Sequence, residues 1–387
     1  MNEMTVVGKY GSAKIVTAGG DKAVDGYALH QIQNLCDDLS SRGSKIRIMP
    51  DVHPGKVCVI GLSMTVGTRV LPEIVGIDIG CGMTVAKVRG VRPEYQKLDS
   101  VIREHVPSGF GRRKEIHRLA TSFDMTRLRC WSHLRRNADG TAHALLGAGT
   151  LGGGNHFIEL DRGEDKDTYL VIHSGSRHLG CEVSDWYLKQ GHQHLKERGE
   201  DVPFELTYLD GELMTDYIHD LQIVQEFASL NRHIIVQEIV RGMKWKLDDE
   251  WECSHNYIDS RNREVPLLRK GAISARKGER VIIPANMRDG VILGKGLGNE
   301  DWNCSAPHGS GRIIRRSDVA KTHTVSEFKG VMRGIYSSCI GKETLDEAPF
   351  AYRPLDEIAD AISPTVSVEQ ILRPLYSYKA GGVAALN

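Results

Sequence analysis

The 387-residue chain lacks several features that would place it in a specialised class of protein. Its eight cysteines include no C-x-x-C pair, which favours reduced thiols over a disulfide framework. No apolar run approaches the roughly 20 residues that cross a bilayer, and the N-terminus has no secretion-signal pattern, so we expect a cytoplasmic protein with no membrane partner. Lysine plus arginine and aspartate plus glutamate both number 50, which excludes a global field that recruits polyanions.

The composition itself is that of a globular protein, with 40% hydrophobic and 26% charged residues. Short apolar runs bounded by turn residues predict strands, among them 45–55 and 84–90. Apolar residues at three- and four-residue steps predict helices near 28–39 and 211–247. Because no linker or internal repeat divides the chain, we predict one α+β domain over residues 1–387. Its packed β-sheets would form a metal-containing cleft, with helices outside.

A local excess of positive charge occurs at residues 103–136. This stretch carries nine lysines and arginines against three acids, and Phe110 and Trp131 lie among them. Such a stretch suits contacts with nucleic-acid phosphates that do not depend on base sequence. A solvated helix face is an equally good interpretation for any single arginine in it.

Five residues scattered along the chain have the chemistry of metal ligands. The segment "GIDIGCGM" places Asp78 and Cys81 three residues apart among glycines. His156 in "GGGNHF", His173 in "VIHSGSR" and His255 in "CSHNY" lie beside small or amide residues that suit sharp backbone turns. One such histidine alone is usually only hydrogen-bonded. Together, the carboxylate, thiolate and three imidazoles suit one or two divalent ions, and Zn, Mn, Fe and Co all remain open.

A further histidine, His308 in "SAPHGSGRIIRR", has a different setting, because glycine, serine and three arginines surround it. Backbone N–H groups of such a loop and guanidinium groups suit a phosphate. A neutral imidazole placed there can attack phosphorus and form a phosphoramidate. A turn that leads into a basic helix explains the same residues equally well.

The order of the motifs resembles that of the RtcB family. The segments are "MPDVHPG", "GIDIGCGM", "VPSGFG", "LGGGNHFIEL", "HSGSR", "SHNY", "HGSGR" and "YSYKAGG", spread over residues 49–382. Members of this family are GTP-dependent RNA ligases that join a 3′-phosphate or 2′,3′-cyclic phosphate end to a 5′-hydroxyl end. The resemblance implies a GMP–histidine enzyme intermediate and an RNA-ppG intermediate. It also implies a role in tRNA processing or RNA repair.

The resemblance also implies roles for individual residues. Two Mn²⁺ ions would be held by Asp78, Cys81, His156, His173 and His255, with the thiolate as the bridge. His308 would be guanylylated, and Arg177 would face RNA phosphate. In the GTP or GMP site, Asn155 and Asn256 would contact phosphate, and Glu159 and Lys379 would contact the guanine. Besides RNA and GTP, the resemblance allows an archease-type activator as a partner.

One segment departs from the family pattern and leaves other functions open. "IPANMRDG" at 283–290 replaces a proline-glycine-serine-methionine-glycine loop near the guanosine, which indicates a divergent bacterial branch for RNA repair. One alternative is a metal-dependent RNA-end phosphodiesterase, which would not need His308. Another is a non-catalytic RNA-binding paralogue, but such a protein is expected to have lost at least one metal ligand. Retention of all five ligands and of His308 favours catalysis.

Overall fold

A computed structural model describes residues 2–17, 24–260 and 264–380. In these residues the strands form two large sheets and a ribbon of β11 (Ala272–Ser274) with β14 (Ser305–Pro307). The first sheet has the strand order β1 (Asn2–Val7), β2 (Ser12–Thr17), β3 (Ile46–His53), β4 (Ile60–Thr65), β10 (Leu267–Lys270) and β9 (Asn256–Asp259). The second has the order β12 (Arg280–Asn286), β13 (Gly290–Gly296), β15 (Val366–Lys379), β6 (Phe157–Arg162), β7 (Thr168–Ser174), β5 (Gly82–Arg89) and β8 (Lys246–Ser254).

The pairing of β5 brings distant parts of the chain to one end of the second sheet. Gly82 at the start of β5 is opposite Ser174 at the end of β7 and opposite Ser254 at the end of β8. All these pairs are antiparallel, so the start of β5 and the ends of β7 and β8 meet at the same edge. The loops at that edge carry the predicted metal ligands.

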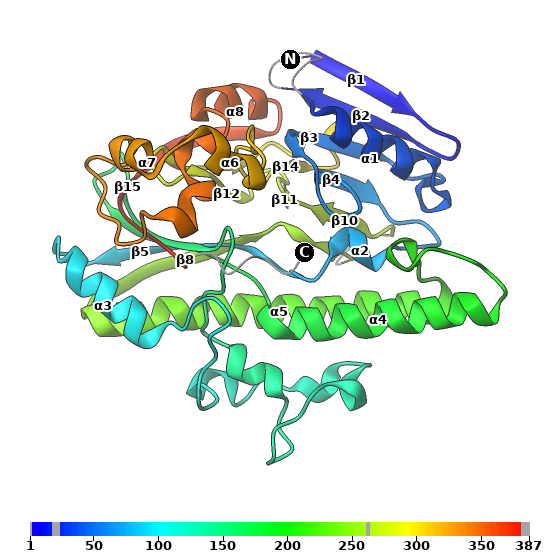
Figure 1. The fold of residues 1–387 in the computed structure, drawn as a ribbon, viewed down its shortest axis with the longest axis horizontal. Helices are drawn as coiled ribbons and strands as arrows, with labels where there is room; N and C mark the ends of the chain where they lie inside the picture. The colour runs from blue at the N-terminus through cyan, green and yellow to red at the C-terminus, as the bar shows by residue number, and fades with distance from the viewer. Residues whose placement is uncertain (1, 18–23, 261–263, 381–387) are drawn as a thin grey trace.

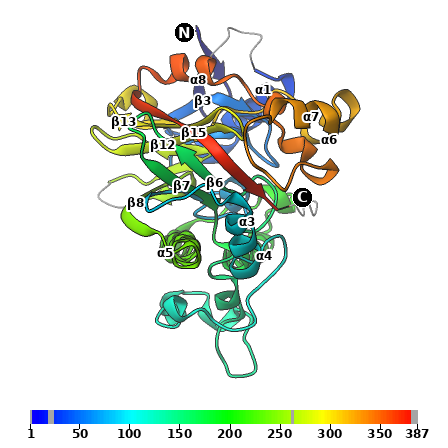
Figure 2. The same cartoon turned by 90° about the vertical axis from the view of Figure 1, so that its left-hand side faces the viewer.

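The helices cover the sheets from outside (Figures 1 and 2). They are α1 (Gly26–Asp37), α2 (Pro72–Val75), α3 (Tyr95–His105), α4 (Arg177–Glu197), α5 (Gly211–Met243), α6 (Arg316–Thr322), α7 (Val325–Val331) and α8 (Leu355–Ile362). The helix predicted at 211–247 ends earlier, because Lys244 takes a left-handed conformation with φ 57° before β8 begins. No helix in the described ranges is long and apolar enough to span a membrane.

Both faces of the second sheet are buried at its strands β5, β6 and β7. On one face Ile158 and Ile172 pack with Ile235 and Ile239 of α5 in a single apolar cluster. On the other face a second cluster joins β5, β6 and β7 to the β12–β13 hairpin and to α8. Burial of apolar area on both faces explains why these strands read as nearly continuous apolar runs. The α+β class with packed sheets and outer helices is thus confirmed, whereas a single domain over 1–387 stays a prediction.

The basic stretch is not the helix that one interpretation assumed. Beyond His105, where α3 ends, residues 106–150 are all described and form loops and short 3₁₀ turns, so a solvated helix face is wrong for them. The segment lies on the side of α4 and α5 that faces away from the sheets (Figures 1 and 2). It is fixed there by the buried carboxylate of Asp220, which accepts the backbone N–H of Arg129 at 2.7 Å and of Cys130 at 3.1 Å.

Candidate metal and nucleotide site

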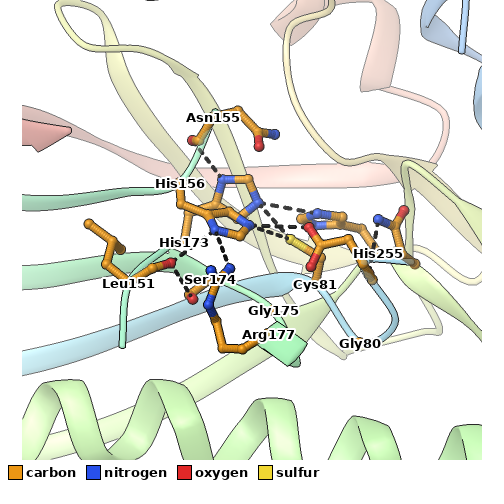
Figure 3. A network of polar contacts seen from close by, with 12 residues as sticks. Gly80, Cys81, Leu151, Asn155, His156, His173, Ser174, Gly175, Arg177 and His255 are labelled. Carbon is orange, nitrogen blue, oxygen red and sulfur yellow. Dashed lines mark hydrogen bonds and ion pairs between the residues drawn. The ribbon is translucent and has the colours of Figure 1, made fainter. Parts of the chain in front are cut away.

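The five predicted metal ligands converge at the edge where β5, β7 and β8 meet, and Figure 3 shows Cys81 with the three histidines. Asp78 and Cys81 lie in the turn that precedes β5, and His156 directly precedes β6. His173 is the penultimate residue of β7 and lies opposite Met83 of β5. His255 separates β8 from β9. Sheet pairing therefore brings together side chains that are far apart in sequence.

Their donor atoms form two overlapping groups that share one thiol. The Sγ atom of Cys81 lies 3.4 Å from Nε2 of His156 and 3.2 Å from Nε2 of His173. The Nε2 atoms of His173 and His255 are 3.3 Å apart, and Nε2 of His156 is 3.2 Å from Oδ2 of Asp78. Within each group, Cys81–His173–His255 and Asp78–Cys81–His156, the ligand atoms lie within 4.8 Å of one another. Each group has the donor chemistry of a divalent metal site.

Hydrogen bonds on the far side of the rings orient two of the histidines. The Nδ1–H of His156 donates to the carbonyl oxygen of Leu151 at 2.9 Å, and that of His173 donates to the carbonyl oxygen of Asn155 at 3.2 Å. These bonds fix the tautomer in which Nε2 carries a lone pair. Both lone pairs face the thiol, as metal ligands require.

Burial sets the charge of the donor groups. It lowers the pKa of His173 and His255 well below the ordinary value, so both imidazoles are neutral. Burial, and then the charge of Asp78, raise the pKa of the Cys81 thiol. For Asp78, burial acts to raise the pKa, but the contacts with His156 and Cys81 and the charge of Arg177 together outweigh it and keep the carboxyl ionised. Neutral imidazoles, a carboxylate and a thiol that loses its proton on binding fit a divalent metal.

His308 lies next to this cluster, in the loop after β14. Its ring centroid is 4.8 Å from that of His255. Its Nδ1–H donates to Oδ2 of Asp51 in β3 at 2.7 Å, and the Asp51 side chain is fully buried. The loop packs directly on β3: at Gly311 (φ 74°) a Cβ atom would approach the carbonyl oxygen of Asp51 to 2.5 Å. Sequence reasoning missed Asp51, although "MPDVHPG" contained it.

Two of the predicted guanine-contacting residues lie on neighbouring strands. Glu159 of β6 is opposite Ser377 of β15 and accepts its hydroxyl hydrogen at 2.9 Å. Burial raises the pKa of Glu159 to about 7. Lys379, at the end of β15, places Nζ 3.5 Å from the carbonyl oxygen of Asn155, so the three predicted residues lie close together. The last two residues of "YSYKAGG", 381 and 382, lie outside the described residues.

The remaining predicted residues, Asn256 and Arg177, also adjoin the metal ligands. The side-chain amide of Asn256 donates to the carbonyl oxygen of Asp78 at 3.4 Å and accepts the N–H of Gly271 at 3.0 Å. Arg177 has φ 55° and places Nη1 3.4 Å from Nδ1 of His156. A Cβ atom at Gly152 would lie 2.1 Å from that Nη1 atom, so glycine leaves the space that the guanidinium group occupies.

Comparison with known proteins agrees with this geometry. The sequence model described as "tRNA-splicing ligase RtcB" matches residues 31–380. RNA-splicing ligase RtcB of Escherichia coli K12 is 31% identical over 371 residues, which cover 86% of this chain and 90% of that protein. tRNA-splicing ligase RtcB of Pyrobaculum aerophilum is 24% identical over 414 residues, which cover 84% and 85%. Because the match spans most of the sequence, the chain belongs to the RtcB family.

Proposed function

We propose that this chain is an RNA ligase that uses GTP and Mn²⁺ to join a 3′-phosphate or 2′,3′-cyclic phosphate end to a 5′-hydroxyl end. Membership of the RtcB family and the ligase names of its relatives support the reaction class. The observation that carries the mechanism is the position of His308, whose ring lies 4.8 Å from His255 and is held by Asp51. A nucleophile therefore lies beside the metal-ligand cluster.

The first step is guanylylation of His308. Because Asp51 accepts the Nδ1–H, the lone pair of His308 is on Nε2 and is free to attack. Nε2 forms a bond to the α-phosphorus of GTP, the bond from that phosphorus to the bridging oxygen breaks, and pyrophosphate leaves. Glu159 and Lys379 would hold the guanine, and Asn155 and Asn256 the phosphates.

Two transfers complete the reaction. An oxygen of the RNA 3′-phosphate attacks the phosphorus of the GMP–histidine, and Nε2 of His308 leaves, which gives an RNA-ppG end. The 5′-hydroxyl then attacks the RNA 3′-phosphorus and expels GMP. A cyclic phosphate must first be opened by water to a 3′-monophosphate. Arg177, next to His156, would hold the RNA phosphate during these steps.

Asp78, Cys81, His156, His173 and His255 would hold two Mn²⁺ ions. When bound, such ions neutralise triphosphate charge and polarise the phosphorus that is attacked. The basic segment 103–136 would hold the RNA backbone outside the site. An archease-type activator, a cytoplasmic location and a role in RNA repair belong to the same proposal.

The test is incubation with Mn²⁺ and α-labelled GTP, followed by denaturing separation. We expect acid-labile label on the wild-type protein and on the control His30→Ala, whose histidine is exposed on α1, and none on His308→Ala. The same proteins are then given RNA with 3′-phosphate and 5′-hydroxyl ends. Metal binding without label on any protein would refute the ligase mechanism, and GTP-independent hydrolysis of RNA ends by His308→Ala would identify a phosphodiesterase.

A further inference from the structure

Glu347 is a buried carboxylate that sequence reasoning did not single out. It ends the 3₁₀ turn Lys342–Glu347 and is 2% exposed. Three cations and a phenol converge on it. Its oxygens accept from Nζ of Lys379 at 2.8 Å, Nη1 of Arg312 at 3.2 Å and the hydroxyl of Tyr352 at 2.6 Å. An ion pair places Nη2 of Arg316 2.8 Å from the same carboxylate.

These partners belong to the two ends of the proposed GMP site. Arg312 follows His308 by four residues and closes the loop that carries the nucleophile. Lys379 is one of the two residues proposed to hold guanine, and the side chain of Glu347 is 3% exposed where the two groups meet. A single carboxylate therefore connects the residue that selects the base with the loop that attacks the phosphate.

The charge of Glu347 is held by the same contacts. Burial acts to raise its pKa, but Lys379, Arg316 and Arg312 outweigh it and keep the pKa well below the usual range. The carboxylate is therefore ionised at every pH at which the enzyme would work. An ionised acceptor at 2.8 Å fixes the direction of the Lys379 side chain.

We propose that Glu347 is a positioning residue that aims Lys379 at the purine and holds it in register with the His308 loop, so that guanine is selected before the histidine reacts. The inference rests on the proposed function. Its chemical basis is the difference between purines at position 6. Guanine presents an oxygen acceptor there, whereas adenine presents an amino donor. An ammonium group has only donors, so a fixed Lys379 accepts guanine and rejects adenine.

The experiment compares Glu347→Gln with wild type in the labelling assay, with GTP and with ATP. We expect KM for GTP to rise on the order of tenfold, as loss of a charged hydrogen bond implies. The preference for GTP over ATP should fall by a similar factor, while kcat at saturating GTP changes less. Glu343→Gln is the matched control, because Glu343 belongs to the same 3₁₀ turn and is exposed. It should leave both values unchanged.

A double-variant cycle separates positioning from a general structural role. If Glu347 acts through Lys379, Glu347→Gln should add little loss of base preference to Lys379→Met. Glu347→Asp keeps the negative charge among the cations, but its shorter side chain withdraws that charge from Lys379. It replaces Glu347→Gln in the experiment if that variant does not fold. Additive losses, or an unchanged GTP preference in a folded variant, would overturn the inference. Absence of label on wild type would instead refute the proposed function.

Discussion

Two buried polar clusters lie close together in this protein, and they differ in whether hydrogen-bond donors meet acceptors. Around Glu347 a carboxylate meets cations such as Lys379 at hydrogen-bonding distance, and the cluster is complete in itself. Around Cys81 the Nε2 atoms of His173 and His255 lie 3.3 Å apart, and that of His173 lies 3.2 Å from the Sγ atom. The difference teaches that convergent ring nitrogens and thiols mark a position for an ion, whereas an acceptor surrounded by donors marks a scaffold.

The largest effect should come from Cys81, which belongs to both ligand groups. Cys81→Ala removes the one atom that the groups share, so we expect labelling by GTP to fall to background and bound Mn²⁺ to fall with it. Metal content after gel filtration and label per protein measure the two effects. Cys253→Ala is the matched control, because this buried thiol in β8 donates to the carbonyl oxygen of Arg280, away from the cluster. Full metal binding by Cys81→Ala would contradict the conclusion that the cluster around Cys81 is a position for an ion.

Asp51 offers a second test, because it contacts the nucleophile without belonging to either cluster. Asp51→Asn replaces the charged carboxylate with a neutral amide. The hydrogen bond from the Nδ1–H of His308 is then weaker, because its acceptor has lost the negative charge. We expect the rate of guanylylation to fall on the order of 100-fold, while Mn²⁺ binding stays as in wild type. Rapid-quench labelling and metal titration give the two numbers. Loss of metal together with label would place Asp51 in the metal cluster instead.

The smallest effect concerns Asp161, a buried carboxyl that neither cluster uses. Its oxygens have no hydrogen-bond partner in the part of the chain that the structure describes. Burial, and then the charge of Glu159, raise its pKa well above the ordinary value. The folded state therefore keeps a proton that the unfolded state releases above about pH 4, and stability is lost as pH rises from there towards the folded pKa.

Asp161→Asn removes this titration. We expect the free energy of unfolding of the variant, relative to wild type, to increase between pH 5 and pH 8. The increase is at most about 1.4 kcal/mol per pH unit. Urea unfolding at several pH values measures it, and Asp201→Asn at an exposed position is the control. A difference that does not change with pH would show that Asp161 is ionised in the folded protein, with an unseen partner.

Much of the fold and of the candidate site was predictable from local pattern, and the rest depends on pairing. The three- and four-residue spacing of apolar residues in α5 and the short apolar runs of β3 and β5 are local properties. These three elements were therefore predicted, with errors at their ends. Asp78 and Cys81 stood out because a carboxylate and a thiol among glycines are unusual. Spacing did not show that His255 would meet them, because that contact depends on the register of β5 with β8.

Asp51 and Glu347 show the limit more clearly. Each acts through a contact with a residue far along the chain, His308 in one case and Lys379 in the other. Asp51 at least lay in a segment that resembled a family motif. Glu347 lies in a stretch with no distinctive pattern, so only the packed structure reveals its partners.

The position of β5 between β7 and β8 has a consequence for the order of events during folding. Two strand pairings, each between segments far apart in the chain, must close before the donor atoms come together. Such non-local pairing forms slowly. An unfolded chain therefore offers no assembled ligand set, and a metal ion can bind only after these strands have paired. Its binding free energy then favours only molecules whose central sheet is already in register, so metal supply acts as a check on correct assembly.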